Sequence, residues 1–515
     1  MRQDFDRYYS AARSRDPRFD GQFFIAVTST GIYCRPICPA QTPKPDNARF
    51  YRCAAAAEAA GFRACRRCRP DAAPGSPEWD VRADAVGRAM RLIGESVVDA
   101  EGVEGLARRL AVSERHLHRQ LVAEVGVGPL ALARTRRAQT ARLLVEQTDL
   151  PLTEVAFAAG FSSIRQFNDS MRAAFGCAPS ELRRRATPAI DGNGLLTLRL
   201  AYRPPFAAAE LLDYLGKRAV PGIEELTGGR FRRVLALPRS TAVAELRPLR
   251  GTNQVQLRLR LDDLRDLSAA VQRCRQLLDL DADPAAVAEV LGADPELAPL
   301  VAARPGLRVP GAADGFELAV RAILGQRVSV TAATSFAGRL VSALGEPLPA
   351  ADGRLTHRFP SAETLASASL DGLPITRAGA AALRALARAV AAGAIELHRG
   401  ADRELAVREL LALPGVGPWT VAYIAMRALG DPDALPVIDL GLRRALQARS
   451  LPADPASVIA RAERWRPWRA YAVLHLWAAP ARPAQAVQLT EGTQVPRREL
   501  TIPAEQTTST TEMSA

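Results

Sequence analysis

The spacing of apolar and polar residues changes three times along the chain. A helical period of three to four residues holds over residues 84–185 and again over 266–477. Between these regions, residues 195–265 contain one helical stretch and four stretches that alternate in steps of two, LLTLRLAY, RRVLALP, TAVAELRPL and QVQLRLRL. The pattern predicts a multidomain α+β protein that is mostly α, with one small antiparallel α+β domain between helical ones.

Interruptions of the pattern mark the expected domain boundaries. Pro74, Gly75, Ser76 and Pro77 begin a linker over residues 76–82, and a second Pro/Gly-bearing linker covers residues 186–194. After Arg482 the chain is polar, rich in Thr, Glu and Pro and without periodicity, which predicts a disordered tail. The predicted domains are 1–75, 83–185, 195–265 and 266–481, followed by the tail 482–515.

The charge of the chain indicates a polyanionic partner. Its 515 residues carry a formal net charge of +13, with a pI near 10. The N-terminus is polar, and no apolar run reaches the length that crosses a bilayer. We therefore expect a cytoplasmic protein that binds double-stranded DNA, without a membrane partner, and nothing in the sequence demands more than a monomer.

Four of the seven cysteines form two close pairs. Cys34 and Cys38 are separated by three residues, and Cys65 and Cys68 by two. In a chain that we expect to be intracellular, such pairs favour one tetrahedral Zn²⁺ over disulfides. Cys53, between the pairs, is expected not to be a ligand. The alternative is a zinc site that only stabilises the fold.

Two sequences around these cysteines, FFIAVTSTGIYCRPICPAQ and AAGFRACRRCRPD, resemble the N-terminal zinc domain of the Ada DNA-repair sensor. The resemblance implies that Cys34 accepts a methyl group from a DNA phosphotriester, with the other three cysteines as zinc ligands. A zinc-bound cysteine is held as the thiolate, which is the nucleophilic form. Four thiolates on Zn²⁺ carry a net charge of about −2, and methylating one leaves about −1, which weakens repulsion of DNA phosphates. The PCHR motif of O6-methylguanine transferases is absent.

The helical region before residue 185 contains two helix-turn-helix patterns. In the first, GLARRLAV leads to Ser113 and the helix SERHLHRQLVAEVG; in the second, LTEVAFAAGF leads to Ser162, Ser163 and the helix IRQFNDSMRAAFG. The phrase AGFSSIRQFNDSMRAAFGCAPSELRR resembles the AraC-type regulators, which implies promoter DNA and RNA polymerase as partners. The alternative is a helical bundle without base contacts. Predicted DNA contacts are Arg115, His116, His118, Arg119, Ser163, Arg165, Gln166 and Asn168.

A tight turn, LPGVGPW over residues 413–419, leads into a helix. Gly415 and Gly417 expose backbone N–H groups at a helix N-terminus, where a DNA phosphate can bind. Asp439 follows Gly417 by 22 residues. The alternative is a plain turn, with Asp439 as a helix N-cap.

The stretch around this turn resembles the helix-hairpin-helix of the base-excision DNA glycosylases. Three further segments resemble the AlkA-type 3-methyladenine DNA glycosylases: RPGLRVPGAADGFELAVRAILGQRVSV, ERWRPWRAYAVLHLW and Arg203-Pro204-Pro205-Phe206. The resemblance therefore implies a helix-hairpin-helix all-α glycosylase domain, with Asp439 as the carboxylate beside the sugar. A carboxylate there stabilises the positive charge that builds on the sugar or orients the attacking water. Asp431 and Asp433 are alternatives in a Gly-Asp-Pro-Asp loop.

An alkylated base carries positive charge and binds aromatic faces well. The resemblance assigns this role to Trp419, Tyr423 and Trp477, and to Tyr214 as well; the alternative is that they are core residues. The base must be flipped out of the duplex, and Gln326 and Arg327 occupy the place of the side chain that fills the gap. Relatives often carry an apolar wedge there, so the role of Arg327 stays open.

No lysine follows Lys217 in the sequence. Glycosylases that also cut the strand use a lysine Schiff base in the second helix of the hairpin, where this chain has Trp419. We therefore predict a monofunctional enzyme that leaves an abasic site. The resemblance also implies a monovalent cation held by the carbonyls of Leu411, Leu413 and Val416.

Together these features predict a protein that couples detection of DNA alkylation to transcription and to removal of alkylated bases. An alternative is a methylation-responsive transcription regulator whose glycosylase half only binds DNA. A third is a zinc-stabilised DNA-binding protein without methyl transfer.

Overall fold

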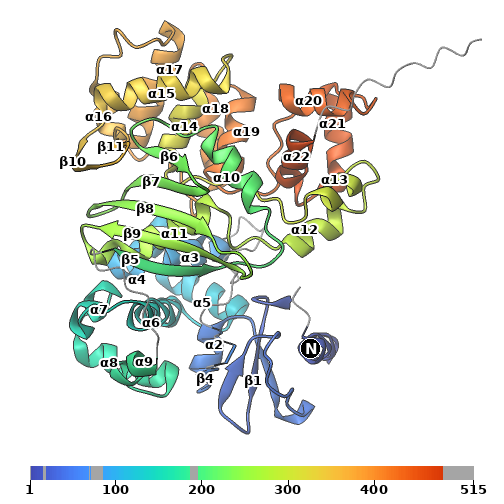
Figure 1. Cartoon of the computed structure of the whole chain (residues 1–515). Coiled ribbons are helices and arrows are strands. Elements are labelled where there is room, and N and C mark those ends of the chain that lie inside the picture. Colours follow the sequence, from blue (N-terminus) through green and yellow to red (C-terminus); the bar gives the residue numbers. More distant parts are fainter. Residues whose placement is uncertain are drawn as a thin grey trace, which may run out of the picture. The chain divides into compact units, whose positions relative to one another are not determined.

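The computed structural model describes residues 2–15, 19–65, 67–68, 70, 85–185 and 195–479 (Figure 1). All of these residues belong to one compact unit. The predicted linkers at 76–82 and 186–194 and the predicted tail at 482–515 lie outside the described residues.

The N-terminal segment is a small sheet with two helices. Its elements are α1 (Arg2–Ser14), β1 (Phe24–Val27), β2 (Ile32–Cys34), β3 (Ala48–Tyr51), α2 (Ala54–Ala59) and β4 (Arg63–Ala64). The strand order is β3–β1–β2–β4; β1 is antiparallel to both neighbours, whereas β2 and β4 are parallel. Phe23 packs between Tyr8 and Phe50, with ring centroids 4.4 and 5.3 Å away. This aromatic cluster fixes α1 against the sheet.

Seven helices follow. They are α3 (Ala85–Gly94), α4 (Val97–Arg109), α5 (Glu114–Val125), α6 (Pro129–Gln147), α7 (Leu152–Ala158), α8 (Ile164–Phe175) and α9 (Pro179–Arg185). The side chain of Ser113 caps α5, and that of Ser163 caps α8. Gly126 and Gly176 end the same two helices in the left-handed conformation. Both predicted helix-turn-helix patterns are therefore present as short helix pairs.

The next segment is an antiparallel sheet with one helix. Its elements are β5 (Leu196–Ala201), α10 (Ala208–Gly216), β6 (Glu224–Thr227), β7 (Arg230–Ala236), β8 (Thr241–Pro248) and β9 (Gln254–Leu261), and the strand order is β5–β9–β8–β7–β6. The sequence predicts four strands and the structure has five. Strand β6 has the sequence EELT, which is too short and too polar to show a period of two. It pairs with β7 through a turn at Gly228 and Gly229, both in the left-handed conformation.

The remaining described residues are mostly helical. The helices are α11 (Leu267–Leu277), α12 (Pro284–Leu291), α13 (Ala298–Ala303), α14 (Gly315–Leu324), α15 (Val330–Leu344), α16 (Ala362–Ser367), α17 (Arg377–Ala391), α18 (Arg403–Ala412), α19 (Pro418–Arg427), α20 (Leu440–Gln447), α21 (Pro455–Ala462) and α22 (Arg469–Ala478). The prediction of continuous helix was wrong at one place, where β10 (Pro347–Asp352) and β11 (Leu355–His357) form a hairpin. The two turn residues are Gly353, with φ +65°, and Arg354, and the missed signal is the glycine at the first turn position.

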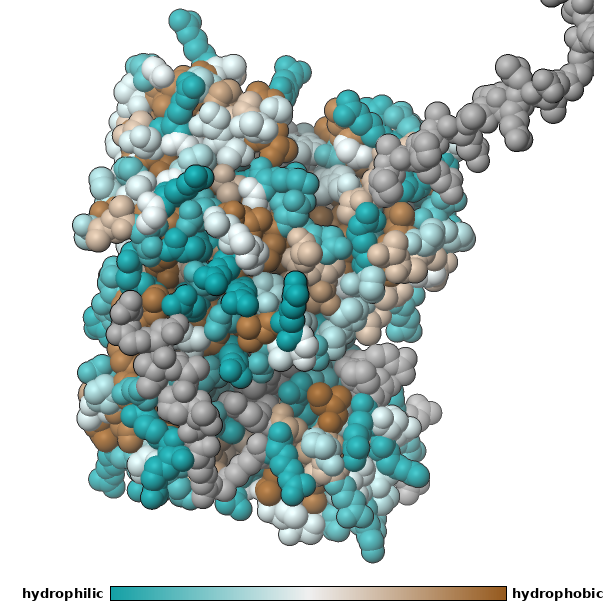
Figure 2. Space-filling view, in the orientation of Figure 1, coloured by the Kyte–Doolittle hydropathy of each residue, from teal (hydrophilic) through white to brown (hydrophobic). Residues whose placement is uncertain are grey.

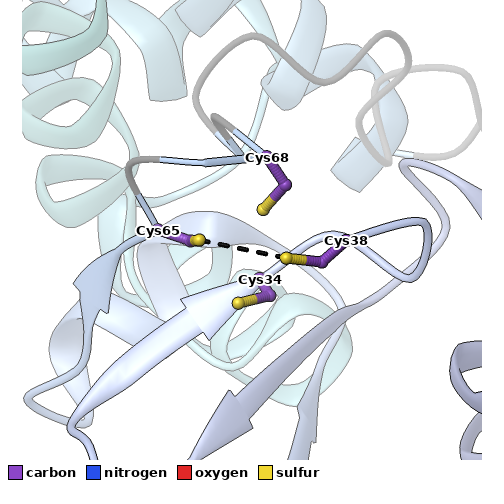
Figure 3. Close-up of side chains that lie close together, drawn as sticks. All are labelled: Cys34, Cys38, Cys65 and Cys68. Carbon is purple, nitrogen blue, oxygen red and sulfur yellow. Dashed lines mark hydrogen bonds between the residues drawn. The ribbon is translucent and has the colours of Figure 1, made fainter. Parts of the chain in front are cut away.

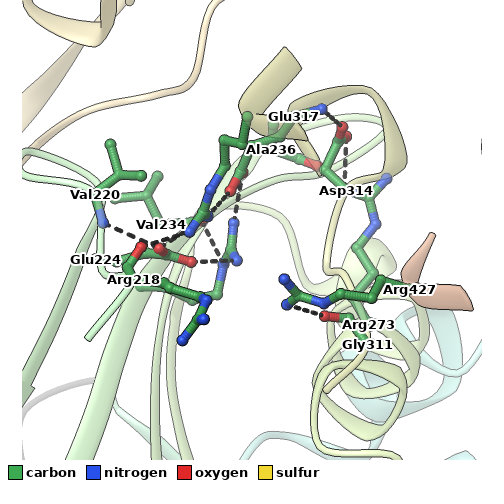
Figure 4. A network of polar contacts seen from close by, with 12 residues as sticks. Arg218, Val220, Glu224, Val234, Ala236, Arg273, Gly311, Asp314, Glu317 and Arg427 are labelled. Atoms are coloured by element: carbon green, nitrogen blue, oxygen red, sulfur yellow. Dashed lines mark hydrogen bonds and ion pairs between the residues drawn. The ribbon is translucent and has the colours of Figure 1, made fainter. Parts of the chain in front are cut away.

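A buried ion network joins the sheet to α14 (Figure 4). Arg233 on β7 donates to Glu224 and to Glu317, each at 2.8 Å, and all three are at most 6 % exposed. Arg321 donates to the same two carboxylates, at 3.0 and 2.8 Å. Burial alone would raise the pKa of Glu317, but the charges of Arg233 and Arg321 outweigh it and lower the pKa. The network therefore fixes β6 and α14, which lie beside the aromatic cluster described below.

Apolar packing connects the front of the chain to the sheet. One core cluster contains side chains of β1, of α8 and of all of β5, β7, β8 and β9, whereas a separate cluster fills the helical region after residue 282. Polar contacts cross the same boundary: Arg136 donates to Gln272 at 2.8 Å, and Gln276 donates to Glu95 at 3.1 Å. On the face drawn in Figure 2, the remaining hydrophobic side chains lie in separate spots among hydrophilic ones.

Candidate functional site

The four paired cysteines lie together at the ends of two parallel strands (Figure 3). Cys34 is the last residue of β2, and Cys65 directly follows β4, with its N–H bonded to Tyr33 O at 2.9 Å. The four sulfur atoms lie within 4.8 Å of one another. A tetrahedral Zn²⁺ with bonds of about 2.3 Å separates its sulfurs by about 3.8 Å, so the cluster fits the ion. The four thiols form a zinc site.

A neighbouring arginine ties the two pairs of cysteines together. The Arg35 backbone N–H points at Cys68 Sγ, at 3.3 Å, and its side chain donates to the Cys68 carbonyl and to Asp20. Each of the four cysteines is only 6 to 8 % exposed, so exposure does not distinguish Cys34 from the others. Cys53 is outside the cluster; its thiol donates to Val125 O at 3.5 Å, and burial raises its pKa to about 11.

The predicted contacts of the two helix-turn-helix units lie on the surface. Arg115, His118 and Arg119 on α5 are exposed, and His116 is half-buried and bonded to Arg119. On α8, Ser163, Arg165 and Gln166 are exposed, and Asn168 is half-buried. Each helix therefore presents one polar face, while Leu117 and Phe167 hold the opposite face in the core.

The predicted hairpin connects α18 to α19. Gly415 has φ +76°, and a Cβ there would lie 3.2 Å from that of Ala382, so the turn requires glycine. Gly417 is the N-cap of α19, and the space around its Cα is open. The amide of Gln326, just after α14, donates to Gly415 O at 3.1 Å and to Thr420 Oγ1 at 2.9 Å. The loop that carries Arg327 is thus bonded to the hairpin.

Asp439 is the N-cap of α20, and two indoles hold its carboxylate. Oδ1 accepts from Leu442 N at 2.6 Å and from Trp477 Nε1 at 2.8 Å, while Oδ2 accepts from Trp419 Nε1 at 2.8 Å. The residue is 8 % exposed, and no described arginine or lysine pairs with it. A cap needs only the bond to the backbone, so the two indole bonds go beyond that structural role. Asp433, in contrast, is paired with Arg466 and Arg469.

The predicted aromatic residues form one cluster around this carboxylate. Tyr423 stacks on Trp419 with centroids 5.3 Å apart, and its hydroxyl lies 3.1 Å from that of Tyr214 on α10. Residues 214 and 423 are thus brought together by packing of α10 near α19. Gln326 joins the cluster only through Thr420 and Gly415, and Arg327 is exposed, with φ +60°.

Two arginines of this cluster were missed from the sequence. Arg427, 5 % exposed, donates to Tyr423 Oη at 2.5 Å, and Arg218 lies over the Tyr214 ring at 3.7 Å. The signal for Arg427 was present, because residues 419, 423 and 427 recur every four positions on one face of α19.

Comparison with known proteins places this geometry in a family. Three family models match: the metal binding domain of Ada at residues 7–71, a helix-turn-helix domain at 106–185, and the AlkA N-terminal domain at 197–314. A probable bifunctional transcriptional activator/DNA repair enzyme AlkA of Mycobacterium tuberculosis is 51% identical over 487 residues, which are 94% of this chain and 98% of the relative. The chain belongs to this AlkA family of bifunctional activator/repair proteins.

Two further relatives each match one half of this family's architecture. DNA-3-methyladenine glycosylase 2 of Escherichia coli is 34% identical over 285 residues, 54% of this chain and 95% of its own length. The bifunctional transcriptional activator/DNA repair enzyme Ada of Escherichia coli is 39% identical over 137 residues, 27% of this chain and 37% of its own. The chain is a DNA-binding repair protein with a zinc site, and among its described helices none is long and apolar enough to cross a membrane.

Proposed function

We propose that the C-terminal half is a monofunctional glycosylase that removes alkylated bases such as 3-methyladenine, with Asp439 as the catalytic carboxylate. The observation that carries the proposal is the pair of indole N–H groups, from Trp419 and Trp477, that hold the two oxygens of Asp439. These bonds fix the carboxylate without a cation that would neutralise it. The negative charge remains available to stabilise an oxocarbenium-like sugar.

The neighbouring residues supply the other requirements of base release. The faces of Trp419, Trp477 and Tyr423 offer stacking surfaces for a flipped cationic base. The backbone N–H groups after Gly415, at the start of α19, offer a site for a DNA phosphate. No lysine follows Lys217 in the sequence, and Lys217 itself is exposed and paired with Asp213 on α10. Hydrolysis by water, without strand cleavage, is therefore the reaction that these residues support.

Release of free base from duplex DNA containing 3-methyladenine tests the assignment. We expect Asp439→Asn to abolish release, because the amide carries no charge and turns an N–H toward an indole donor. Asp454→Asn is the matched control, since Asp454 caps α21 through Ser457 N at 3.0 Å and makes no indole bond. Release by the Asp439 variant would contradict the catalytic role of Asp439. No release by the folded wild type across several alkylated bases would leave the C-terminal half as a DNA-binding platform.

We further propose that Cys34 takes a methyl group from a DNA methyl-phosphotriester. Bound zinc would keep the cluster's sulfurs as thiolates. In the transfer, a bond forms between Cys34 Sγ and the methyl carbon, the bond from that carbon to the phosphate oxygen breaks, and a phosphodiester anion leaves. One negative charge is lost from the cluster, so affinity for DNA rises.

Methylation then enables the helix-turn-helix region to bind promoter DNA and recruit RNA polymerase, and the protein acts as a monomer.

Mass spectrometry after incubation with methyl-phosphotriester DNA tests the transfer of the methyl group to Cys34. We expect one added methyl group on Cys34, with Cys38, Cys65 and Cys68 as internal controls. An added methyl group on another cysteine would move the acceptor, and none at all would leave a zinc site that only stabilises the fold.

A further inference from the structure

Arg427 is a buried cation without a carboxylate partner among the described residues. Its Nε donates to Pro310 O at 2.8 Å, its Nη2 to Gly311 O at 3.2 Å, and its Nη1 to Tyr423 Oη at 2.5 Å. In Figure 4 no dashed line joins Arg427 to any of the carboxylates drawn. A buried charge needs compensation. Among the described residues, the phenol of Tyr423 accepts a hydrogen bond from this guanidinium, and the Tyr214 ring faces it at 5.2 Å.

The hydrogen bonds around Tyr423 restrict where its proton can point. A guanidinium can only donate, so Tyr423 Oη accepts from Arg427. The bond to Tyr214 Oη, at 3.1 Å, can run in either direction. When Tyr214 donates as well, the O–H of Tyr423 is free for an acceptor on a bound base. When Tyr423 is ionised, its oxygen accepts from both neighbours.

Charged groups near this phenol come from α10, α14 and the start of α20. Helix α10 contributes Arg218, whose guanidinium lies over the Tyr214 ring at 3.7 Å. On α14, Arg321 is balanced by Glu317 and by Glu224 of β6, and Asp439 reaches the cluster only through Trp419. From α18, no charged side chain of the described residues contacts Tyr423. Burial raises the pKa of Tyr423, but Arg427, Arg218 and the bond from Tyr214 outweigh it and bring the pKa to about 8.

We propose that Tyr423 is a specificity residue of the base site. The protonation state of its hydroxyl, which depends on Arg427 and Tyr214, selects between uncharged and cationic damaged bases. As a phenol it donates a hydrogen bond to an acceptor nitrogen or oxygen of an uncharged purine and helps that base to leave. As a phenolate it offsets the two guanidiniums and favours a cationic base, which they would otherwise repel. The inference rests on the proposed glycosylase function, because the bases meet Tyr423 beside Trp419 and Asp439.

The test measures single-turnover release of two bases by the full-length protein from about pH 6.5 to about pH 9.5. This range includes the pKa of Tyr423, which is lowered to about 8. The cationic base is 3-methyladenine, the uncharged base is 1,N6-ethenoadenine, and rates without enzyme are subtracted. The readout is the ratio of the cationic to the uncharged rate, which cancels effects common to both, such as those of Asp439. We expect this ratio to rise through a midpoint near the pKa of Tyr423.

Two variants and a control separate this role from a structural one. Tyr423→Phe should remove the pH dependence of the ratio and, at the acid end, raise the ratio about tenfold, the effect of one lost hydrogen bond. Tyr214→Phe removes a bond that lowers the pKa of Tyr423, so the midpoint should move to higher pH. Tyr202→Phe, which removes a hydroxyl bonded to Thr252 O elsewhere, should match the wild type.

The outcomes are distinct. No release of 3-methyladenine or of several other alkylated bases by folded wild-type protein would refute the glycosylase function itself. Release of 3-methyladenine with no ethenoadenine release at any pH, or with a ratio that does not change with pH, would overturn only the inference. Equal losses for both bases in Tyr423→Phe, with the pH profile retained, would also overturn it. If Tyr423→Phe fails to fold, the midpoint shift in Tyr214→Phe decides the question.

Discussion

The zinc site and the Asp439 site are assembled in different ways. The four cysteines lie within 35 residues of chain, and two strand ends bring them together. The groups around Asp439 come from α10, α19, the start of α20 and α22, and the most distant, Tyr214 and Trp477, are 263 positions apart in sequence. A locally built site depends on its own ligands, whereas a site built from distant elements depends on the packing that holds them.

Removing zinc should have the largest effect and should be confined to the first site. Structural zinc contributes about 10 kcal/mol or more of apparent binding energy to small domains. We expect chelation to abolish methyl transfer and to leave release of 3-methyladenine intact, with both assays run on the same sample. Zinc added back should restore methyl acceptance. A parallel loss of base release would show that the two sites are not independent.

Glu317→Gln should weaken the support of the second site. Breaking a buried pair costs about 3–5 kcal/mol, which urea unfolding can measure. The control is Glu346→Gln, which breaks an exposed pair with Arg358 and should cost about 1 kcal/mol or less.

The same carboxylate predicts a pH dependence of stability. Because folding lowers the pKa of Glu317, its contribution is full above its unfolded pKa and is lost as the pH falls through the folded value. Between about pH 5 and about pH 3, the wild type should therefore lose more of its free energy of unfolding than Glu317→Gln does. Equal losses would contradict the buried pairing.

Trp477→Phe keeps a ring in the cluster and removes one donor to Asp439. A hydrogen bond to a charged group contributes about 1.5 kcal/mol or more, so base release should fall about tenfold or more. Trp465→Phe provides the control, because Trp465 Nε1 donates to Asp294 at 2.9 Å, away from the site. It should lower stability without lowering the rate per folded molecule. Unchanged release in Trp477→Phe would mean that this bond does not serve catalysis.

The smallest effect is expected at a helix cap. Ser163→Ala removes the side-chain acceptor for Gln166 N and should cost about 1 kcal/mol, loosening α8 and weakening promoter binding. Ser361→Ala removes the equivalent cap of α16 and should leave promoter binding unchanged. Gel-shift titration measures both, and an equal loss in the two variants would argue against a DNA-binding role for α8.

The same contrast explains what could be predicted. The spacing of Cys34, Cys38, Cys65 and Cys68 is enough to predict a zinc site. The predicted zinc and the multidomain, mainly helical fold are confirmed. Helix caps such as those at Ser113 and Ser163 depend only on neighbouring residues, so a local pattern can encode them. The roles of the individual site residues stay predictions.

What could not be predicted depends on distant contacts or on very short elements. The hydroxyl pair of Tyr214 and Tyr423 and the position of Arg218 depend on the packing of α10 near α19, which no local pattern encodes. Strand β6 has only four residues, and its Glu224 is buried because Arg233 and Arg321 neutralise it. A polar residue paired inside the core reads as a surface residue when the sequence is taken alone.

The bond from Gln326 to the hairpin has an evolutionary consequence. Its amide spans Gly415 O and Thr420 Oγ1, so any other residue there would leave a buried acceptor unmatched, or misplace the loop. Arg327, at the exposed tip of that loop, does not make these bonds to the hairpin. Among related chains we therefore expect substitutions to be tolerated at position 327 and to be rare at position 326, so that the side chain at the tip can change while the bonds that position the loop are kept.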